Sequence, residues 1–143
     1  MKPLINALIA LFLVLAPSSN GNAETVAEFI ERASNLRNFG DDMMHPEGRV
    51  LTVLSVSSMK VENAYSRAEI AEIAGVWVPT MKDYKVTNLE IIQETVMSEF
   101  VSVVYSLNYE IVGDMTVSGF ARILSILQKR GSTYRTVFAV QIE

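Results

Sequence analysis

Five polar side chains in the C-terminal half of the sequence have the types and spacing to form a binding site. They lie on two expected strands that an antiparallel pairing would place side by side: Glu99, Tyr105, Tyr109, Arg122 and Gln128. Arg122 opposite Tyr105 could hold a carboxylate or a carbonyl oxygen, since the guanidinium supplies charge and the phenol a hydrogen-bond donor. The alternative, which we favour, is a structural Arg–Glu or Arg–Tyr pair that satisfies itself inside the fold or at an interface. No catalytic residue can be named from the sequence.

Two expected turns decide where these side chains lie. Gly113-Asp114 and Arg130-Gly131 each separate two alternating runs, which predicts two-residue hairpin loops. The runs that flank them predict the last three strands of an antiparallel meander. With a shorter strand before the second helix and another after it, the expected strands are 49–56, 84–92, 96–112, 115–128 and 133–142.

The first turn also predicts a register. If Val112 pairs with Met115, the residues that lie opposite each other are Tyr105 and Arg122, Leu107 and Phe120, and Glu99 and Gln128. The second turn would place Ala139 on the other side of Arg122. A bulge beyond either turn would exchange the two faces, because successive side chains of a strand point to opposite sides.

Two amphipathic helices are expected to cover one face of this sheet. Residues 25–39 carry apolar side chains at spacings of three and four, with Thr25 and Glu28 as a capping box. A shorter helix begins at Ser66, with Glu69 completing its capping box, and is expected to end at Gly75. The order of elements predicts an α+β fold: helix, strand, helix and then long antiparallel strands.

Both faces of the expected sheet are rich in apolar residues. An antiparallel sheet with one solvated face normally alternates polar and apolar side chains, and two helices can cover only one face of strands this long. The uncovered face therefore predicts a second copy of the chain, and we expect a homodimer that forms through the sheet.

The N-terminus has the plan of a secretory signal. Lys2 precedes an apolar run from Ala7 to Ala16, and Gly21-Asn22-Ala23 places small residues before an expected cleavage site. The apolar run is too short to span a bilayer, which needs about 20 residues. We therefore expect a signal peptide at 1–23 and one domain at 24–143, exported to the periplasm or the medium of a bacterium and not held at a membrane after cleavage.

Composition narrows the possible partners. The chain has no cysteine, and its formal charge of −4 becomes −5 when residues 1–23, with Lys2 as their only charged side chain, are removed. An acidic domain without a basic cluster is a poor candidate for nucleic acid binding. His45 has acidic neighbours, yet one histidine among loop carboxylates makes a weak metal site, so we expect neither a metal nor another cofactor.

The last two expected strands resemble a known superfamily. The sequence GFARILSILQKRGSTYRTVFAVQ, residues 119–141, is similar to the final hairpin of the nuclear transport factor 2-like superfamily. The similarity rests on Gly119, Ala121 and Arg122, then Lys129-Arg130-Gly131, then Tyr134-Arg135. It is strongest to small bacterial members near the SnoaL-like and calmodulin-kinase association-domain branches. The resemblance implies a strongly curved, mainly antiparallel sheet that forms a cone around the N-terminal helices; a cystatin-like fold is the alternative.

The resemblance also implies an apolar pocket between the concave face of the sheet and the helices. Some relatives use this pocket for isomerisation, dehydration or cyclisation of apolar substrates, while others bind ligands or assemble. We expect a small-molecule-binding or assembly module, and the alternative is an isomerase- or dehydratase-like enzyme acting on an apolar carbonyl compound. A cavity of roughly 300 Å³ or more with an inward carboxylate would indicate the enzyme. A cavity without an acid–base pair would indicate the binding module, and a filled cavity would indicate assembly.

Overall fold

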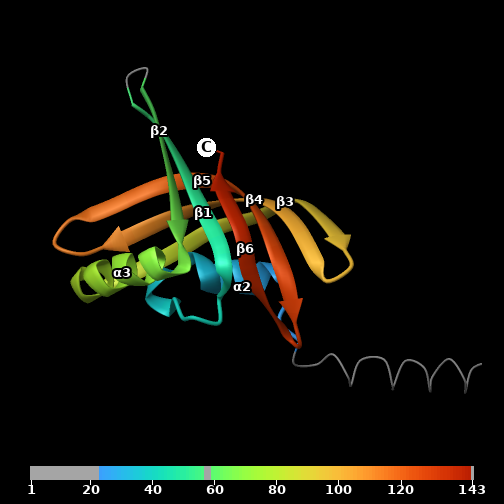
Figure 1. The fold of residues 1–143 in the computed structure, drawn as a ribbon. Helices are drawn as coiled ribbons and strands as arrows, with labels where there is room; N and C mark the ends of the chain where they lie inside the picture. The colour runs from blue at the N-terminus through green and yellow to red at the C-terminus, as the bar shows by residue number, and fades with distance from the viewer. Residues whose placement is uncertain (1–22, 57–58, 143) are drawn as a thin grey trace, which may run out of the picture.

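The protein is built on one curved, mixed sheet with its helices on one side (Figure 1). A computed structural model describes residues 23–56 and 59–142, so the expected signal peptide lies, except for Ala23, outside the described residues. The sheet order is β2-β1-β6-β5-β4-β3, antiparallel except for the parallel pair β1 and β6. The strands are β1 (Met44–Val56), β2 (Met59–Ser66), β3 (Asp83–Met97), β4 (Phe100–Val112), β5 (Thr116–Arg130) and β6 (Thr133–Gln141). The α+β prediction with a curved, mainly antiparallel sheet is confirmed.

The first helix is shorter than expected. Helix α2 (Val26–Ser34) begins with the predicted capping box, in which Thr25 and Glu28 satisfy each other's backbone N–H groups. The helix stops where Asn35 adopts an extended conformation. The Asn35 side chain accepts a hydrogen bond from the Arg37 N–H and so caps a separate 3₁₀ turn, η1 (Leu36–Asn38).

The second helix is longer than expected. Helix α3 (Arg67–Trp77) begins at the predicted Ser66 cap, but it runs through Gly75 instead of ending there. It is followed by the 3₁₀ turn η2 (Val78–Thr80), which contains Pro79. Proline has no N–H to donate and clashes with the preceding turn, so it ends the α-helix more effectively than a glycine, which a helix tolerates at a cost of about 1 kcal/mol.

One strand was not predicted. Strand β2 pairs with β1 over eight residue pairs, from Arg49 with Ser66 to Val56 with Met59. Its sequence, MKVENAYS, has few β-branched residues and no clean alternation, so it does not resemble a strand by itself. Its pairing with β1 stabilises a conformation that its own propensities do not favour.

The register between β4 and β5 differs by one residue from the prediction. Val112 pairs with Thr116, so the loop has three residues, and the Gly113 N–H donates to the Met115 carbonyl at 3.1 Å. The Val112 carbonyl in turn accepts from the Lys82 N–H at 2.7 Å. A shift of one residue turns every side chain of β5 to the opposite face. The predicted pairs of Tyr105 with Arg122, Leu107 with Phe120 and Glu99 with Gln128 are therefore wrong; the structure pairs Tyr105 with Ile123, Ser106 with Arg122, Leu107 with Ala121 and Phe100 with Gln128.

The last hairpin also differs in detail. Its loop is Gly131-Ser132, because Arg130 pairs with Thr133, and Gly131 has a φ of +58°. A register shift between Ile126 and Leu127 follows. The predicted pair of Arg122 and Ala139 is wrong for this reason, and Ala139 lies opposite Ser125.

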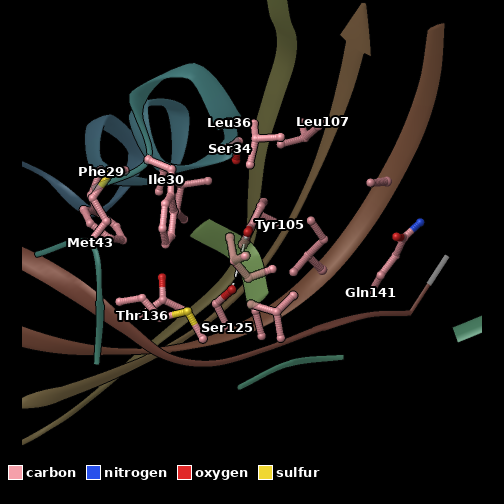
Figure 2. Close-up of a pocket in the computed structure, with 18 of the residues that line it drawn as sticks. Phe29, Ile30, Ser34, Leu36, Met43, Tyr105, Leu107, Ser125, Thr136 and Gln141 are labelled. Atoms are coloured by element: carbon pink, nitrogen blue, oxygen red, sulfur yellow. Dashed lines mark hydrogen bonds between the residues drawn. The ribbon is translucent and has the colours of Figure 1, made fainter. Parts of the chain in front are cut away.

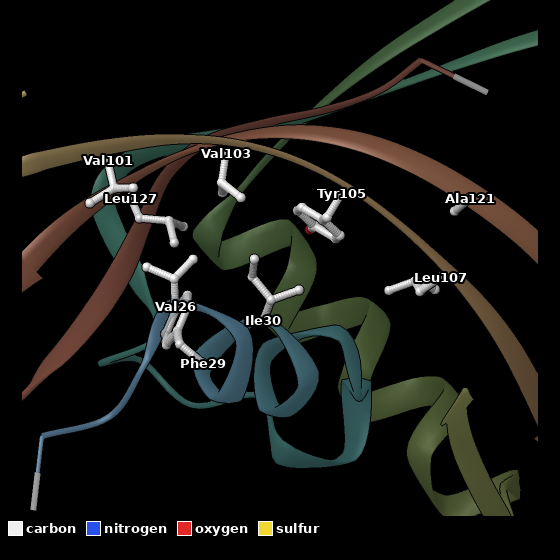
Figure 3. Packing of buried hydrophobic residues seen from close by; sticks show 9 residues of the cluster. All are labelled: Val26, Phe29, Ile30, Val101, Val103, Tyr105, Leu107, Ala121 and Leu127. Atoms are coloured by element: carbon white, nitrogen blue, oxygen red, sulfur yellow. The ribbon is translucent and has the colours of Figure 1, made fainter. Parts of the chain in front are cut away.

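The core lies between α2 and the concave face of the sheet. Figure 3 shows Phe29 and Ile30 of α2 pointing at side chains of β4 and β5. Phe29 and Ile30 are 1% and 2% exposed, and Val103 is fully buried. The cluster comprises Val26, Phe29, Ile30, Val101, Val103, Tyr105, Leu107, Ala121 and Leu127.

The opposite, convex face is also apolar even though the register differs. Directly opposed residues of neighbouring strands point to the same face, and successive residues of one strand point to opposite faces. The residue pairs next to those of the core cluster therefore belong to the convex face. They place six large apolar residues on three adjacent strands: Val104, Phe120, Leu124, Ile126, Phe138 and Val140. Phe120 is 48% exposed and the other five are half-buried. We call this set the convex patch.

Candidate functional site

A cavity of about 310 Å³ opens between the helices and the concave face of the sheet (Figure 2). Helix α2 provides Phe29 and Ile30, and β4 provides Leu107. The other apolar wall residues are Ala33, Leu36, Phe39, Met43, Met44, Val50, Leu51, Ile70, Ala121, Ile123, Leu127 and Ala139. The volume is at the lower end of the range for small-molecule sites, roughly 300–1,000 Å³, so it suits a compact ligand.

Seven polar side chains among the described residues line this apolar cavity. Figure 2 shows Tyr105 and Ser125 near its centre and Gln141 at one end. The Tyr105 hydroxyl and the Ser125 Oγ are 3.4 Å apart, and either can be the donor. These polar residues are Ser34, Tyr84, Tyr105, Tyr109, Ser125, Thr136 and Gln141.

Two tyrosines of the wall, Tyr84 and Tyr105, have raised pKa values. Burial raises the pKa of Tyr105, and hydrogen bonds with Ser125 and Ser34 oppose this only in part. Burial also raises the pKa of Tyr84, and the neighbouring phenols of Tyr109 and Tyr105 act in the same direction. A phenol with a raised pKa is neutral at physiological pH, so Tyr84 and Tyr105 are hydrogen-bond donors and poor bases.

The described residues that line the cavity include no Asp, Glu, Lys, Arg or His. An enzyme that moves a proton at neutral pH normally places such a group, with an adjusted pKa, within hydrogen-bond reach of the substrate. The wall instead offers hydroxyl groups and one amide. The described wall residues can therefore bind a ligand through these hydrogen-bonding groups and apolar contacts.

The cavity lining contains only two of the five residues predicted as a site. Tyr105 and Tyr109 line the cavity. Glu99 and Gln128 lie outside its lining, where the Gln128 amide donates to the Glu99 carboxylate at 2.9 Å and accepts from the Arg135 Nε at 2.7 Å. These two residues form part of a polar chain on the protein surface.

Arg122 is also outside the cavity. It pairs with Ser106 on the convex side, and its guanidinium lies 5.9 Å from the centre of the Phe120 ring. The prediction that Tyr105 and Arg122 share a face is wrong because β5 is shifted by one residue against β4. Ala121 and Ile123, the neighbours of Arg122 on β5, line the cavity instead of Arg122.

Five polar residues of the described wall were not predicted: Ser34, Tyr84, Ser125, Thr136 and Gln141. Ser125 interrupts an apolar series on β5, between Ile123 and Leu127 at spacings of two, and this spacing could have identified it once the register was known. Ser34 ends α2, where a serine is unremarkable. Nothing in the local sequence connects it with Tyr105, which follows some seventy positions later.

His45 lies in β1 and not in the expected loop. Its Nδ1 accepts a hydrogen bond from the Glu47 N–H at 3.1 Å. Within residues 23–56 and 59–142, no three His, Cys, Asp or Glu side chains are grouped closely enough to hold a metal ion. No helix in the same part of the chain is long and apolar enough to cross a membrane.

Comparison with known proteins gives similarity in structure only. No family model matches the sequence, and no curated protein matches it. A conserved protein from Planctomyces limnophilus is 9% identical with a TM-score of 0.58, over 78% of this chain and 82% of that one. A candidate scytalone dehydratase from Novosphingobium aromaticivorans is 8% identical with a TM-score of 0.51, over 99% and 87%. A candidate calcium/calmodulin-dependent protein kinase II association domain from Xanthomonas campestris is 17% identical with a TM-score of 0.50, over 79% and 77%.

These similarities concern the fold. The chain has the nuclear transport factor 2-like fold that the C-terminal resemblance implied. At such low identity the fold does not carry an activity with it, because this architecture hosts unrelated functions. The function has to be argued from the cavity.

Proposed function

We propose that this protein is an exported small-molecule-binding module whose ligand occupies the cavity beneath the curved sheet. The observation that carries the proposal is an open cavity of about 310 Å³ with a mainly apolar wall and no charged side chain among its described lining residues. A cavity that served only to assemble the protein would be filled by side chains, because protein interiors are otherwise close-packed.

The second candidate function is an isomerase or dehydratase acting on an apolar carbonyl compound. A structural neighbour is described as a candidate scytalone dehydratase, and Tyr105 could donate a hydrogen bond to a substrate carbonyl. This function needs a base, however, and the described wall supplies only hydroxyls and an amide. The binding function is therefore the better supported of the two.

The proposal includes a homodimer formed through the convex patch. Its six residues lie on the side of the sheet away from the core, and Phe120 is 48% exposed. Apolar patches of this kind on one face commonly mark protein interfaces. A two-fold dimer would bury the same patch on both copies and leave each cavity on its own side of the interface.

Native mass spectrometry of protein purified gently from the exported fraction tests all parts of the proposal together. We expect a chain that begins at Glu24, a dimer, and a discrete additional mass from a retained small molecule. Ile126→Lys, in the convex patch, is expected to give a monomer, whereas Met115→Lys, at an 80% exposed loop position, leaves the dimer intact.

Each part can fail separately in this experiment. If the wild-type protein is a monomer, the proposed dimer is wrong, and the proposed ligand binding in the cavity is unaffected. If neither a retained ligand nor any added small apolar compound binds, the binding function is wrong. An unprocessed N-terminus in the cytoplasmic fraction contradicts export.

A further inference from the structure

Three hydroxyl groups from three separate elements converge on the cavity wall. Ser34 ends α2, Tyr105 lies on β4 and Ser125 lies on β5. Figure 2 shows all three within the cavity, with the Tyr105 to Ser125 hydrogen bond drawn. We call these residues the hydroxyl cluster. They are the central polar group of a wall that is otherwise mainly aliphatic and aromatic.

The hydroxyl cluster has hydrogen-bonding capacity to spare. Tyr105 is 6% exposed and Ser125 is 2% exposed, so neither is well hydrated by bulk water. Their mutual hydrogen bond is 3.4 Å long, well beyond the usual 2.7–2.8 Å between hydroxyls. Each hydroxyl can donate one hydrogen bond and accept two. A ligand oxygen placed against them would gain short hydrogen bonds that the protein does not make by itself.

The same wall selects against charge. The described lining contains no cation to pair with a carboxylate or phosphate and no anion to pair with an amine. Moving an ionised group from water into such a site without a partner is strongly unfavourable. The phenol and the serine hydroxyls can satisfy a carbonyl, a hydroxyl or an ether oxygen, each of which is neutral.

We propose that the cavity selects a compact, neutral, mainly apolar ligand whose carbonyl or hydroxyl oxygen binds at Tyr105 and Ser125. This inference rests on the proposed binding function and specifies its ligand class. It departs from the arrangement expected from the sequence, in which Arg122 would have made a carboxylate acceptable.

Three naphthalene probes of nearly equal size test the inference: naphthyl methyl ketone, isopropylnaphthalene and naphthoate. They share the naphthalene ring and differ in its substituent, which is an acetyl group with a neutral oxygen, an isopropyl group with no oxygen, or a carboxylate. Dissociation constants are measured by probe fluorescence at neutral pH. Wild-type protein is expected to bind the ketone and the hydrocarbon, and to bind naphthoate at least a hundredfold more weakly than the ketone.

Two variants each remove one hydroxyl from the cluster. Tyr105→Phe and Ser125→Ala are each expected to weaken the affinity for the ketone about tenfold. The affinity for the hydrocarbon should stay within about twofold of the wild-type value, because only the ketone loses a hydrogen bond. Tyr134→Phe and Ser106→Ala are the matched controls. Tyr134 packs against the core outside the cavity lining, and Ser106 is 7% exposed on the convex side. Both controls are expected to leave all three affinities unchanged.

The outcomes separate this inference from the proposed function. If the ketone and the hydrocarbon bind but neither cluster variant changes the ratio of their dissociation constants, the hydroxyl cluster does not bind the ligand oxygen. The proposed binding function would then still stand. Tightest binding of naphthoate would overturn the selection against charge. If none of the three probes binds, the proposed binding function fails and the inference fails with it.

Discussion

The ring of Tyr109 on β4 occupies the space that a side chain at Gly119 on β5 would need. The two residues are directly opposite in the register, and a β-carbon added at Gly119 would lie 2.5 Å from the Tyr109 Cζ and 2.9 Å from its Cε1. Carbon atoms that are not bonded to each other do not approach so closely. Gly119 therefore lets the ring of a cavity residue lie against the neighbouring strand.

Gly119→Ala is expected to displace the Tyr109 ring and to destabilise the protein by about 1 kcal/mol, since the crowded group is the movable end of a side chain and not backbone. A double-mutant cycle with Tyr109→Ala, followed by urea unfolding, checks the contact. The two substitutions should be coupled by at least about 0.5 kcal/mol, because the truncated ring leaves room for the new methyl group. Additive effects would contradict the contact.

Gly131 and Gly75 are expected to respond oppositely to the same substitution. Gly131 has a φ of +58°, where a β-carbon costs about 1 kcal/mol, so Gly131→Ala is expected to destabilise the protein by that amount. Gly75 is exposed within α3, and a β-carbon there would meet nothing within 4 Å. Gly75→Ala is expected to stabilise the protein by about 0.5–1 kcal/mol. The melting temperatures of the two variants should therefore lie on opposite sides of the wild type.

Glu24 connects the start of the described chain to α2 and β6. Its carboxylate accepts from the Arg32 Nε at 2.8 Å and from the Thr133 hydroxyl. The hydrogen bond from Arg32 is the main cause of the lowered pKa of Glu24; burial opposes it, and the Thr133 hydrogen bond adds to it. A carboxyl with a lowered folded-state pKa stabilises the protein above its unfolded pKa, and this contribution is lost as the pH falls through the folded value.

Glu24→Gln is expected to reduce the free energy of unfolding by about 1 kcal/mol at pH 7, a value discounted because Arg32 is partly exposed. The difference from the wild type should shrink as the pH falls below the ordinary glutamate value of 4.5, because the wild-type carboxyl then becomes protonated as well. Chemical unfolding over a pH series measures this. Glu31→Gln, on the exposed side of α2, serves as the control and should differ little from the wild type. A difference for Glu24→Gln that does not depend on pH would contradict the assignment.

Leu127 of β5 is among the largest fully buried side chains of the described residues. It is 1% exposed and packs in the cluster with Val26 and Phe29, so Leu127→Ala is expected to cost about 2–5 kcal/mol. Met115→Ala is the matched control, since Met115 is 80% exposed, and its effect is expected to stay within about 0.5 kcal/mol. Similar losses for the two variants in thermal unfolding would mean that β5 does not pack as described.

The sequence by itself determined the features that depend on neighbours along the chain. The capping boxes at Thr25 and Ser66 were predicted and are present, because a cap and its partner are only three residues apart. The four long strands from 84 onward were also predicted, since alternation is a local signal, but the turn between the first two lies at Ser98-Glu99 and not at 93–95. The C-terminal resemblance added the fold, which the similar solved structures confirm.

Only the tertiary structure decided which side chains face the cavity. The loop after Val112 has three residues. Hydrogen bonds from Gly113 to Met115 and from the distant Lys82 to Val112 accompany this loop, and its length cannot be read from the sequence of the turn. Because side chains alternate at every residue, that single position moved Arg122 out of the predicted site and placed Ser125 in the cavity. The parallel pairing of β1 with β6 and the convergence of Ser34 on Tyr105 likewise join residues far apart in the chain, and such contacts form only when the whole sheet curves around α2.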